Sequence, residues 1–298
     1  MSNAVELKNI TKRYKKTVAV NALDMEVPKG VIYGLLGRNG AGKTTTINII
    51  MGLVRPNTGS VHVLGKDARK HREYALSNMG AIVESPSLYR NLTAEQNLQI
   101  TADLHNVDKK RVDEVLQITG ILNEKSKKVK HYSTGMKQRL GIANALIHSP
   151  KIIILDEPTN GLDPEGVSNL RDFIKSLNKQ LGITVIMSSH ILSEVEQVAD
   201  YVGIIDKGRL IDQFAMNELN ISEQNHLLIE VDHPPKATEV LSSNGISYDL
   251  QGNEIKVFCD KQKNGEINRL ISSEGITIFN MSSMKNSLED KFLSVVNE

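Results

Sequence analysis

The chain has 298 residues and a formal net charge of +1, a length that suits one large domain or two unequal ones. The balanced charge gives no general attraction to nucleic acid or to an anionic membrane, so we expect no nucleic-acid partner. The single cysteine, Cys259, excludes an internal disulfide and favours the cytosol as the compartment.

The first predicted elements are strands. Val5–Ile10 and Leu23–Val27 have strand character, and a turn at residues 28–30 leads into a third apolar run, Val31–Leu36. Tyr14 lies between the first two strands. It is either an ordinary turn aromatic or a face on which adenine stacks, and its spacing does not decide between the two.

A glycine-rich loop follows the third strand and precedes an apolar helix pattern, Thr46–Met51. This order predicts the phosphate-binding loop of an ATPase or GTPase rather than a glycine-rich turn of a structural βα unit. The glycines let successive N–H groups point at phosphate oxygens, and the helix N-terminus adds partial positive charge. Lys43 can reach the β- and γ-phosphates, and the Thr44 hydroxyl can ligate Mg²⁺. The predicted nucleotide-binding residues are Gly37, Arg38, Asn39, Gly40, Ala41, Gly42, Lys43, Thr44 and Thr45.

Two strands and a helical region come next. Ser60–Leu64 and Met79–Glu84 are predicted strands. Residues from about 91 to 122 have a helical pattern, in which Thr93 caps one helix and Asp108 another. The basic run Lys125–Tyr132 is typical of a solvated face, since no aromatic residues interleave with its lysines to support nucleic-acid binding.

Ser133 is the natural N-cap of a helix that extends to about His148. The continuous apolar run Ile152–Leu155 then predicts a buried parallel strand. It ends in Asp156 and Glu157, and adjacent carboxylates at the end of a buried strand are costly unless they serve a ligand.

Asp156 suits a role in holding Mg²⁺, and Glu157 suits polarising a water molecule for attack on the γ-phosphate. The alternative is a structural ion pair. A predicted helix, Pro164–Leu181, and a strand, Ile183–Ser188, lead to His190. A lone histidine is usually a surface or core residue, but this one follows a buried strand and can reach the same site.

Residues 221–298 predict a small α+β unit. Three strand-like runs, Leu227–Val231, Ile255–Phe258 and Ile276–Asn280, are separated by helical patterns at Lys236–Ser243 and Gly265–Ser273. The order suggests βαββαβ with a terminal helix at Ser287–Val296, and Pro234-Pro235 prevents a helix from passing through that point. This unit carries no motif for chemistry, so packing or dimerisation is favoured over regulation of the ATPase.

Five motifs in fixed order resemble the ATPase subunit of an ABC transporter over about residues 4–220. They are Gly37–Thr44, Tyr132–Arg139, Ile152–Glu157, Asn160–Asp163 and Ser189–His190. The resemblance implies an α/β fold. Residues 1–220 would form a P-loop ABC ATPase core with a mixed sheet and helices. This core would include a helical subdomain at about 86–148. Residues 221–298 would form the C-terminal accessory α+β domain.

The resemblance also implies roles for single residues. Tyr14 would stack on adenine, and His190 would hold the γ-phosphate and the attacking water. Asp163 would belong to a loop that crosses the dimer interface. The signature loop, Ser133, Thr134 and Gly135, would contact the γ-phosphate of ATP held by a partner subunit.

Two departures from the usual family sequence indicate a particular group within the family. The usual signature Leu-Ser-Gly-Gly-Gln is here Tyr132–Met136, a variant similar to those of ABC-2 exporters. The family usually has Gln where this chain has Glu84. A glutamate at this position resembles the ATPase subunits of bacitracin and lantibiotic self-protection, and staphylococcal peptide exporters have similar subunits. Glu84 is therefore a further predicted Mg²⁺ ligand, and it would link the site to the membrane partner.

The resemblance favours a motor subunit that uses ATP and Mg²⁺ to drive export of peptides or antimicrobial compounds. It would dimerise with itself or with a paralogous ATPase subunit and act on separate integral membrane permease subunits. Because no signal peptide or membrane-spanning run is apparent, we expect a cytoplasmic protein on the inner face of the membrane.

The alternatives are an importer motor, a soluble ABC ATPase of translation or DNA repair, and a P-loop kinase. A single cassette without a long heptad run fits the soluble ABC ATPases poorly. A kinase would not need the signature loop or Asp163. The cargo cannot be read from this chain.

Overall fold

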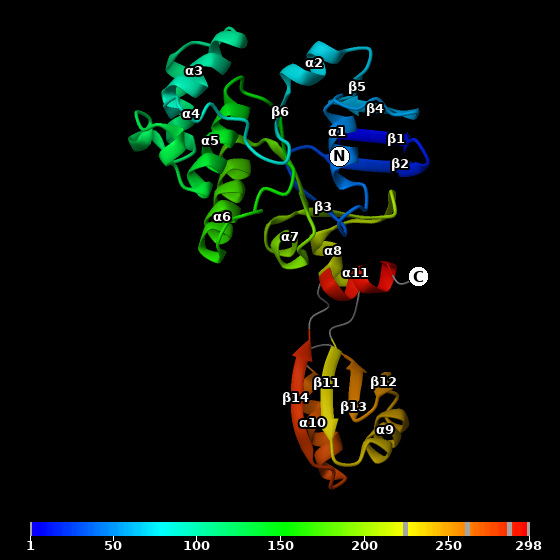
Figure 1. Cartoon of the computed structure of the whole chain (residues 1–298). Helices are drawn as coiled ribbons and strands as arrows, with labels where there is room; N and C mark the ends of the chain where they lie inside the picture. The colour runs from blue at the N-terminus through cyan, green and yellow to red at the C-terminus, as the bar shows by residue number, and fades with distance from the viewer. Residues whose placement is uncertain (1, 223–225, 260–262, 285–287, 297–298) are drawn as a thin grey trace. The chain divides into compact units, whose positions relative to one another are not determined.

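The computed structural model describes residues 2–222, 226–259, 263–284 and 288–296, which fall into two units, 1–215 and 216–298 (Figure 1). Each unit has a hydrophobic core of its own. Among the described residues, no helix is long and apolar enough to cross a membrane.

A six-stranded sheet organises the first unit. Its strand order is β10-β9-β3-β8-β7-β6, and all neighbouring strands are parallel except the edge pair β9 and β10. Every residue of the central strands β3, β7 and β8 is buried, which explains the continuous apolar sequence of β7 and the apolar middle of β8. The strands are β3 (Ile32–Leu36), β6 (Met79–Ile82), β7 (Ile152–Leu155), β8 (Thr184–Ser189), β9 (Tyr201–Asp206) and β10 (Arg209–Ala215).

A smaller antiparallel sheet with the order β2-β1-β4-β5 belongs to the same unit. Its strands are β1 (Asn3–Tyr14), β2 (Thr17–Pro28), β4 (Thr58–Val63) and β5 (Lys66–Asp67). The helix α1 (Lys43–Ile50) shares a core with it, in which Ile47 and Ile50 are buried against apolar residues of the first two strands. The short helix α2 (Arg72–Ser77) precedes β6.

Helices α3 (Ala94–Leu104), α4 (Lys110–Ile118) and α5 (Thr134–Leu146) gather on one side of the unit, as Figure 1 shows. Thr93 forms a capping box with Gln96, as the sequence predicts for the start of α3. Short 3₁₀ turns at Leu122–Glu124 and Val129–His131 lead to α5. Helices α6 (Pro164–Leu181) and α7 (Leu192–Val198) complete the unit.

Some predicted boundaries were wrong by a few residues. The strand expected at Met79–Glu84 ends at Ile82, and Glu84 follows in a loop with φ of +62°. The N-cap of α4 is Lys109 and not Asp108, the residue that the sequence predicted. The Asp108 carboxylate accepts a hydrogen bond from the Lys110 N–H. The first helix begins at Lys43, three residues before the predicted start.

The second unit follows the predicted order βαββαβ, with the four strands in the spatial order β12-β13-β11-β14. This is the arrangement of the ferredoxin-like fold. Its helix α9 begins at the Pro234-Pro235 pair, because proline is tolerated in the first turn of a helix. The elements are α8 (Met216–Ser222), β11 (His226–Val231), α9 (Pro234–Ser243), β12 (Tyr248–Gln251), β13 (Glu254–Phe258), α10 (Asn264–Ser273), β14 (Ile278–Met284) and α11 (Leu288–Val296).

Candidate active site

The glycine-rich loop joins β3 to α1 at the carboxyl end of the parallel sheet. Gly42 is the N-cap of α1 with φ of +111°, a conformation that favours glycine. A Cβ atom at Gly37 would lie 2.4 Å from the Ile205 carbonyl oxygen, and one at Gly42 would lie 2.7 Å from the Ala19 carbonyl oxygen. Close backbone approach therefore requires glycine at both positions, and at Gly42 the positive φ requires it as well.

A cavity of about 330 Å³ opens over this loop. It brings together six of the predicted phosphate-loop residues with the two predicted catalytic residues, Glu157 and His190. The N-terminus of α1 lies at the same place, where helix N–H groups favour an anion. Its lining residues are Ala19, Asn39, Gly40, Gly42, Lys43, Thr44, Thr45, Glu157, Asn160 and His190.

The Lys43 side chain is 5% exposed and is held by three oxygens. Its Nζ donates to the carbonyl oxygens of Gly37, at 2.6 Å, and Arg38, at 3.2 Å. It also forms an ion pair at 3.1 Å with Oε1 of Glu157. Gly37 and Arg38 thus contribute backbone acceptors to the site, although they do not line the cavity.

Glu157 connects the other groups of the site. Its Oε2 lies 2.6 Å from Nδ1 of His190, and an ionised carboxylate only accepts, so Nδ1 is the donor. Its backbone has φ of +49°, an uncommon conformation for this residue type that occurs at functional sites. The Glu157 N–H donates to Oγ of Ser188 at 2.9 Å, and that hydroxyl donates to Oδ1 of Asp156 at 2.6 Å.

Asp156 and Thr44 are the side chains that fit a magnesium ion here. Thr44 lines the cavity, and Asp156 is a buried carboxylate directly before Glu157. No cluster of three or more His, Cys, Asp or Glu side chains able to hold a metal occurs in the described parts of the chain. Mg²⁺ usually binds one or two carboxylates and completes its shell with phosphates and water.

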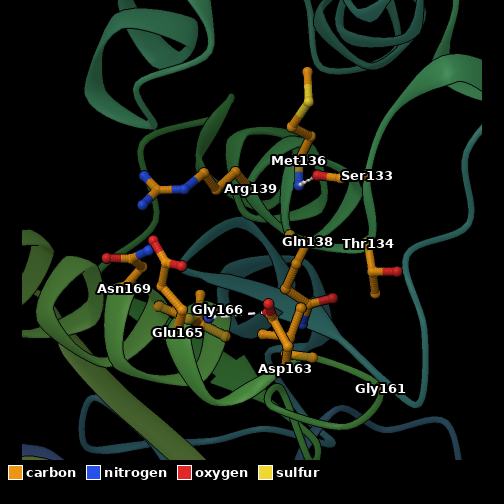
Figure 2. Close-up of a pocket in the computed structure, with 13 residues that line it drawn as sticks. Ser133, Thr134, Met136, Gln138, Arg139, Gly161, Asp163, Glu165, Gly166 and Asn169 are labelled. Carbon is orange, nitrogen blue, oxygen red and sulfur yellow. Dashed lines mark hydrogen bonds between the residues drawn. The ribbon is translucent and has the colours of Figure 1, made fainter.

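The signature residues lie elsewhere. Ser133, Thr134, Gly135 and Asp163 line a separate cavity of about 550 Å³ between the start of α5 and the start of α6 (Figure 2). Ser133 caps α5 by accepting from the Met136 N–H, and Asp163 caps α6 by accepting from the Gly166 N–H. None of these four residues lines the cavity over the phosphate loop.

Tyr14 and Glu84, both predicted site residues, line neither cavity. Tyr14 ends β1, is 45% exposed, and has the Lys12 ammonium 5.0 Å from its ring centroid. Glu84 lies in the loop after β6 and lines neither cavity. Ala41, also predicted, is buried in the core beside the loop.

Sequence reasoning missed Ala19, Asn160 and Ser188. Asn160 belongs to a quoted motif and carried a signal, because it follows the candidate base by three residues. No sequence signal pointed to Ala19 or Ser188. Ser188 matters only because β8 pairs with β7, which places its hydroxyl beside residues more than thirty positions away.

Comparisons with known proteins show the family of this chain. A family model for the ABC transporter matches residues 20–160. The bacitracin transport ATP-binding protein BcrA of Bacillus licheniformis is 41% identical, covering 99% of this chain and 98% of its own length. The lantibiotic transport ATP-binding protein SrtF of Streptococcus pyogenes is 44% identical, covering 70% of this chain and 89% of its own.

A solved structure shares the fold. The dimeric post-hydrolysis state of the ATP-binding cassette MJ0796, bound to ADP and Pi, matches with a TM-score of 0.64 at 25% identity, covering 71% of this chain and 98% of that one. The predicted family and its α/β ATPase fold are confirmed. The chain belongs to the ATP-binding, ATP-hydrolysing subunits of ABC transporters.

Proposed function

We propose that this protein is the motor subunit of an exporter. It hydrolyses ATP at the cavity over the phosphate loop and drives export of peptides or antimicrobial compounds through separate transmembrane subunits. The observation that carries the proposal is the hydrogen-bonded network of Lys43, Glu157 and His190. The direction of transport is supported by the names of BcrA and SrtF, which concern bacitracin and lantibiotic transport.

The roles follow from the positions of the side chains. Lys43 binds the β- and γ-phosphates, to which its ammonium can turn from Glu157. Glu157 accepts the proton of the attacking water, and His190 orients this carboxylate through the Nδ1 hydrogen bond. Thr44 and Asp156 would hold Mg²⁺, which supplies positive charge to the phosphates when bound.

The proposed active form contains two ATPase subunits. Ser133 and Gly135 line a cavity different from the one that holds Lys43, so each phosphate-loop site needs signature residues from a second chain. The dimer of MJ0796 supports such an arrangement. The second chain is another copy or a paralogous ATPase subunit, and Asp163 lies at their interface.

We place the protein on the cytoplasmic face of the cell membrane, bound to its permease subunits. Glu84 and the following loop would carry movement from the site to the permease. Its position just beyond β6, close in sequence to α3, suits this role. Tyr14, at the end of β1, would stack on the adenine ring.

Export can be tested in cells that lack this chain and are complemented with wild type or with Glu157→Gln. Labelled bacitracin and a labelled lantibiotic serve as probes of cellular accumulation. We expect lower accumulation of at least one probe with wild type only, and co-purification of an integral membrane protein with both variants. Equal accumulation in all cells, or higher accumulation with wild type, would contradict an exporter of these compounds.

A further inference from the structure

Glu194 is a buried carboxylate next to the active site. It lies in the first turn of α7 and is 7% exposed. No ion pair found within the described ranges involves it. A buried carboxylate without a cation is costly unless hydrogen bonds satisfy it, so its partners indicate its purpose.

Two hydroxyl groups supply those hydrogen bonds. Oε2 of Glu194 accepts from Oγ1 of Thr159 at 2.8 Å and from Oγ of Ser189 at 3.1 Å. Both donors are buried, at 7% and 1% exposure. The Ser189 hydroxyl also accepts from the Ile191 N–H at 3.0 Å, and the carboxylate at 3.1 Å is a closer acceptor for its proton than the Ile191 carbonyl at 3.4 Å.

The two donors come from the two segments that carry the catalytic pair. Thr159 lies two residues after Glu157, in the loop that follows β7. Ser189 ends β8 and directly precedes His190. A single oxygen of Glu194 therefore binds both the segment that carries Glu157 and the segment that carries His190. The side chains of these two residues meet at 2.6 Å in the cavity.

We propose that Glu194 is a positioning residue that fixes the Glu157–His190 pair for hydrolysis. It does not line the ATP cavity, so it acts through the two loops and not on ATP itself. Hydrogen bonds to an ionised acceptor are stronger than those between neutral groups, and burial strengthens them further. The inference rests on the proposed catalytic roles of Glu157 and His190.

Steady-state ATPase assays of the full-length protein test this inference. In Glu194→Ala we expect kcat to fall about 10- to 100-fold, the loss typical of a misplaced catalytic group, with KM for ATP little changed. Glu194→Gln should keep most of kcat, because its amide oxygen can accept from both hydroxyls. Glu196→Ala is the matched control, since this exposed glutamate lies on the same helix.

A double-mutant cycle tests the route of the effect. Thr159→Val removes one donor with little change of shape and should lower kcat less than Glu194→Ala does. Combined with Glu194→Ala, it should add almost nothing, because the bond it removes is already lost. Thr159→Ser keeps the hydroxyl and should retain activity.

Several results would overturn the role of Glu194. One is a wild-type kcat in Glu194→Ala, and another is an equal loss of kcat in Glu194→Ala and Glu194→Gln. The others are additive losses of kcat in the double-mutant cycle and a loss of ATP affinity that parallels the loss of kcat. Lys43→Ala and Glu157→Gln, assayed beside these variants, separate the two proposals. If those two hydrolyse ATP normally, the proposed site is wrong; if they are inactive while Glu194→Ala is normal, only the positioning role is wrong.

Discussion

At the scale of single residues, Lys43 has two competing partners. Its ammonium pairs with Glu157 at 3.1 Å, and the same charge is needed by the phosphates of ATP. If the proposed roles hold, binding of ATP would draw Lys43 away from the carboxylate and leave Glu157 hydrogen-bonded to His190. This exchange of partners would link nucleotide binding to activation of the proposed base.

Lys43→Ala should lower ATP hydrolysis by about 100-fold or more, the usual effect of removing a group that stabilises transition-state charge. The measurement is phosphate release at saturating ATP and Mg²⁺. Lys207→Ala is the control, because its ammonium is 90% exposed. Hydrolysis by Lys43→Ala at the control rate would refute the assignment of the phosphate site.

Glu157→Gln should lower kcat by about 100-fold or more, because the general base is lost. ATP affinity should stay the same or rise, since the amide no longer holds Lys43 by an ion pair. Phosphate release measures kcat, and titration with a fluorescent ATP analogue measures the affinity. Size exclusion with ATP and Mg²⁺ should show the ATP-bound dimer. A variant that turns over normally is incompatible with the role given to Glu157.

Local sequence patterns pointed to the phosphate loop and to the candidate base, because each pattern is a short run of adjacent residues. Lys43, Thr44, Glu157 and His190 do meet in one cavity. The hydroxyls that hold them could not be predicted in this way. Ser188 depends on the pairing of β7 with β8, which no local pattern specifies.

At the scale of elements, capping residues and prolines gave the most information about where helices begin and end. The helix Pro164–Leu181 was predicted with its observed bounds, because Asp163 caps it, Pro164 begins it and Gly182 ends it with φ of +62°. The start of α1 was misplaced because glycine-rich sequence does not look helical. Short elements such as α2 and β5 carried too little pattern to be found.

A histidine pair joins two elements of the helical region. The rings of His105, at the end of α3, and His148, just after α5, are stacked with centroids 4.4 Å apart. His148 Nε2 donates to the Met79 carbonyl at 3.1 Å, and its buried Nδ1 has no hydrogen-bond partner among the described residues. Burial lowers the pKa of His148, and the nearby His105 lowers it further.

The stability of this unit should therefore depend on pH. Because the pKa of His148 in the folded state is below its unfolded value near 6.5, the unfolded state binds the extra proton more readily. Its contribution to stability is present above pH 6.5 and is lost as the pH falls towards the folded pKa. Thermal unfolding between pH 8 and 5 should show a smaller fall in Tm for His148→Gln than for wild type. Identical pH profiles would contradict this account.

At the scale of the whole molecule, we propose that one chain contains two half-sites. The phosphate-loop cavity and the signature cavity have different lining residues, and no residue lines both. Closure of two chains would bring a signature loop to each phosphate loop, and ATP would then stabilise the closed dimer that it joins. Hydrolysis would reopen the dimer, and a permease attached to both chains would move with it.

Complementation between two inactive subunits is the most direct test of this central claim. Ser133→Arg blocks the signature loop, and Lys43→Ala disables the phosphate site of the other chain. Differently tagged subunits should be purified as a verified heterodimer, with the two variant homodimers as controls. We predict that the heterodimer recovers ATPase activity well above both homodimers, because one of its two sites is intact. A heterodimer no more active than its parents, or a Ser133→Arg homodimer that hydrolyses ATP at the wild-type rate, would contradict a site shared between two chains.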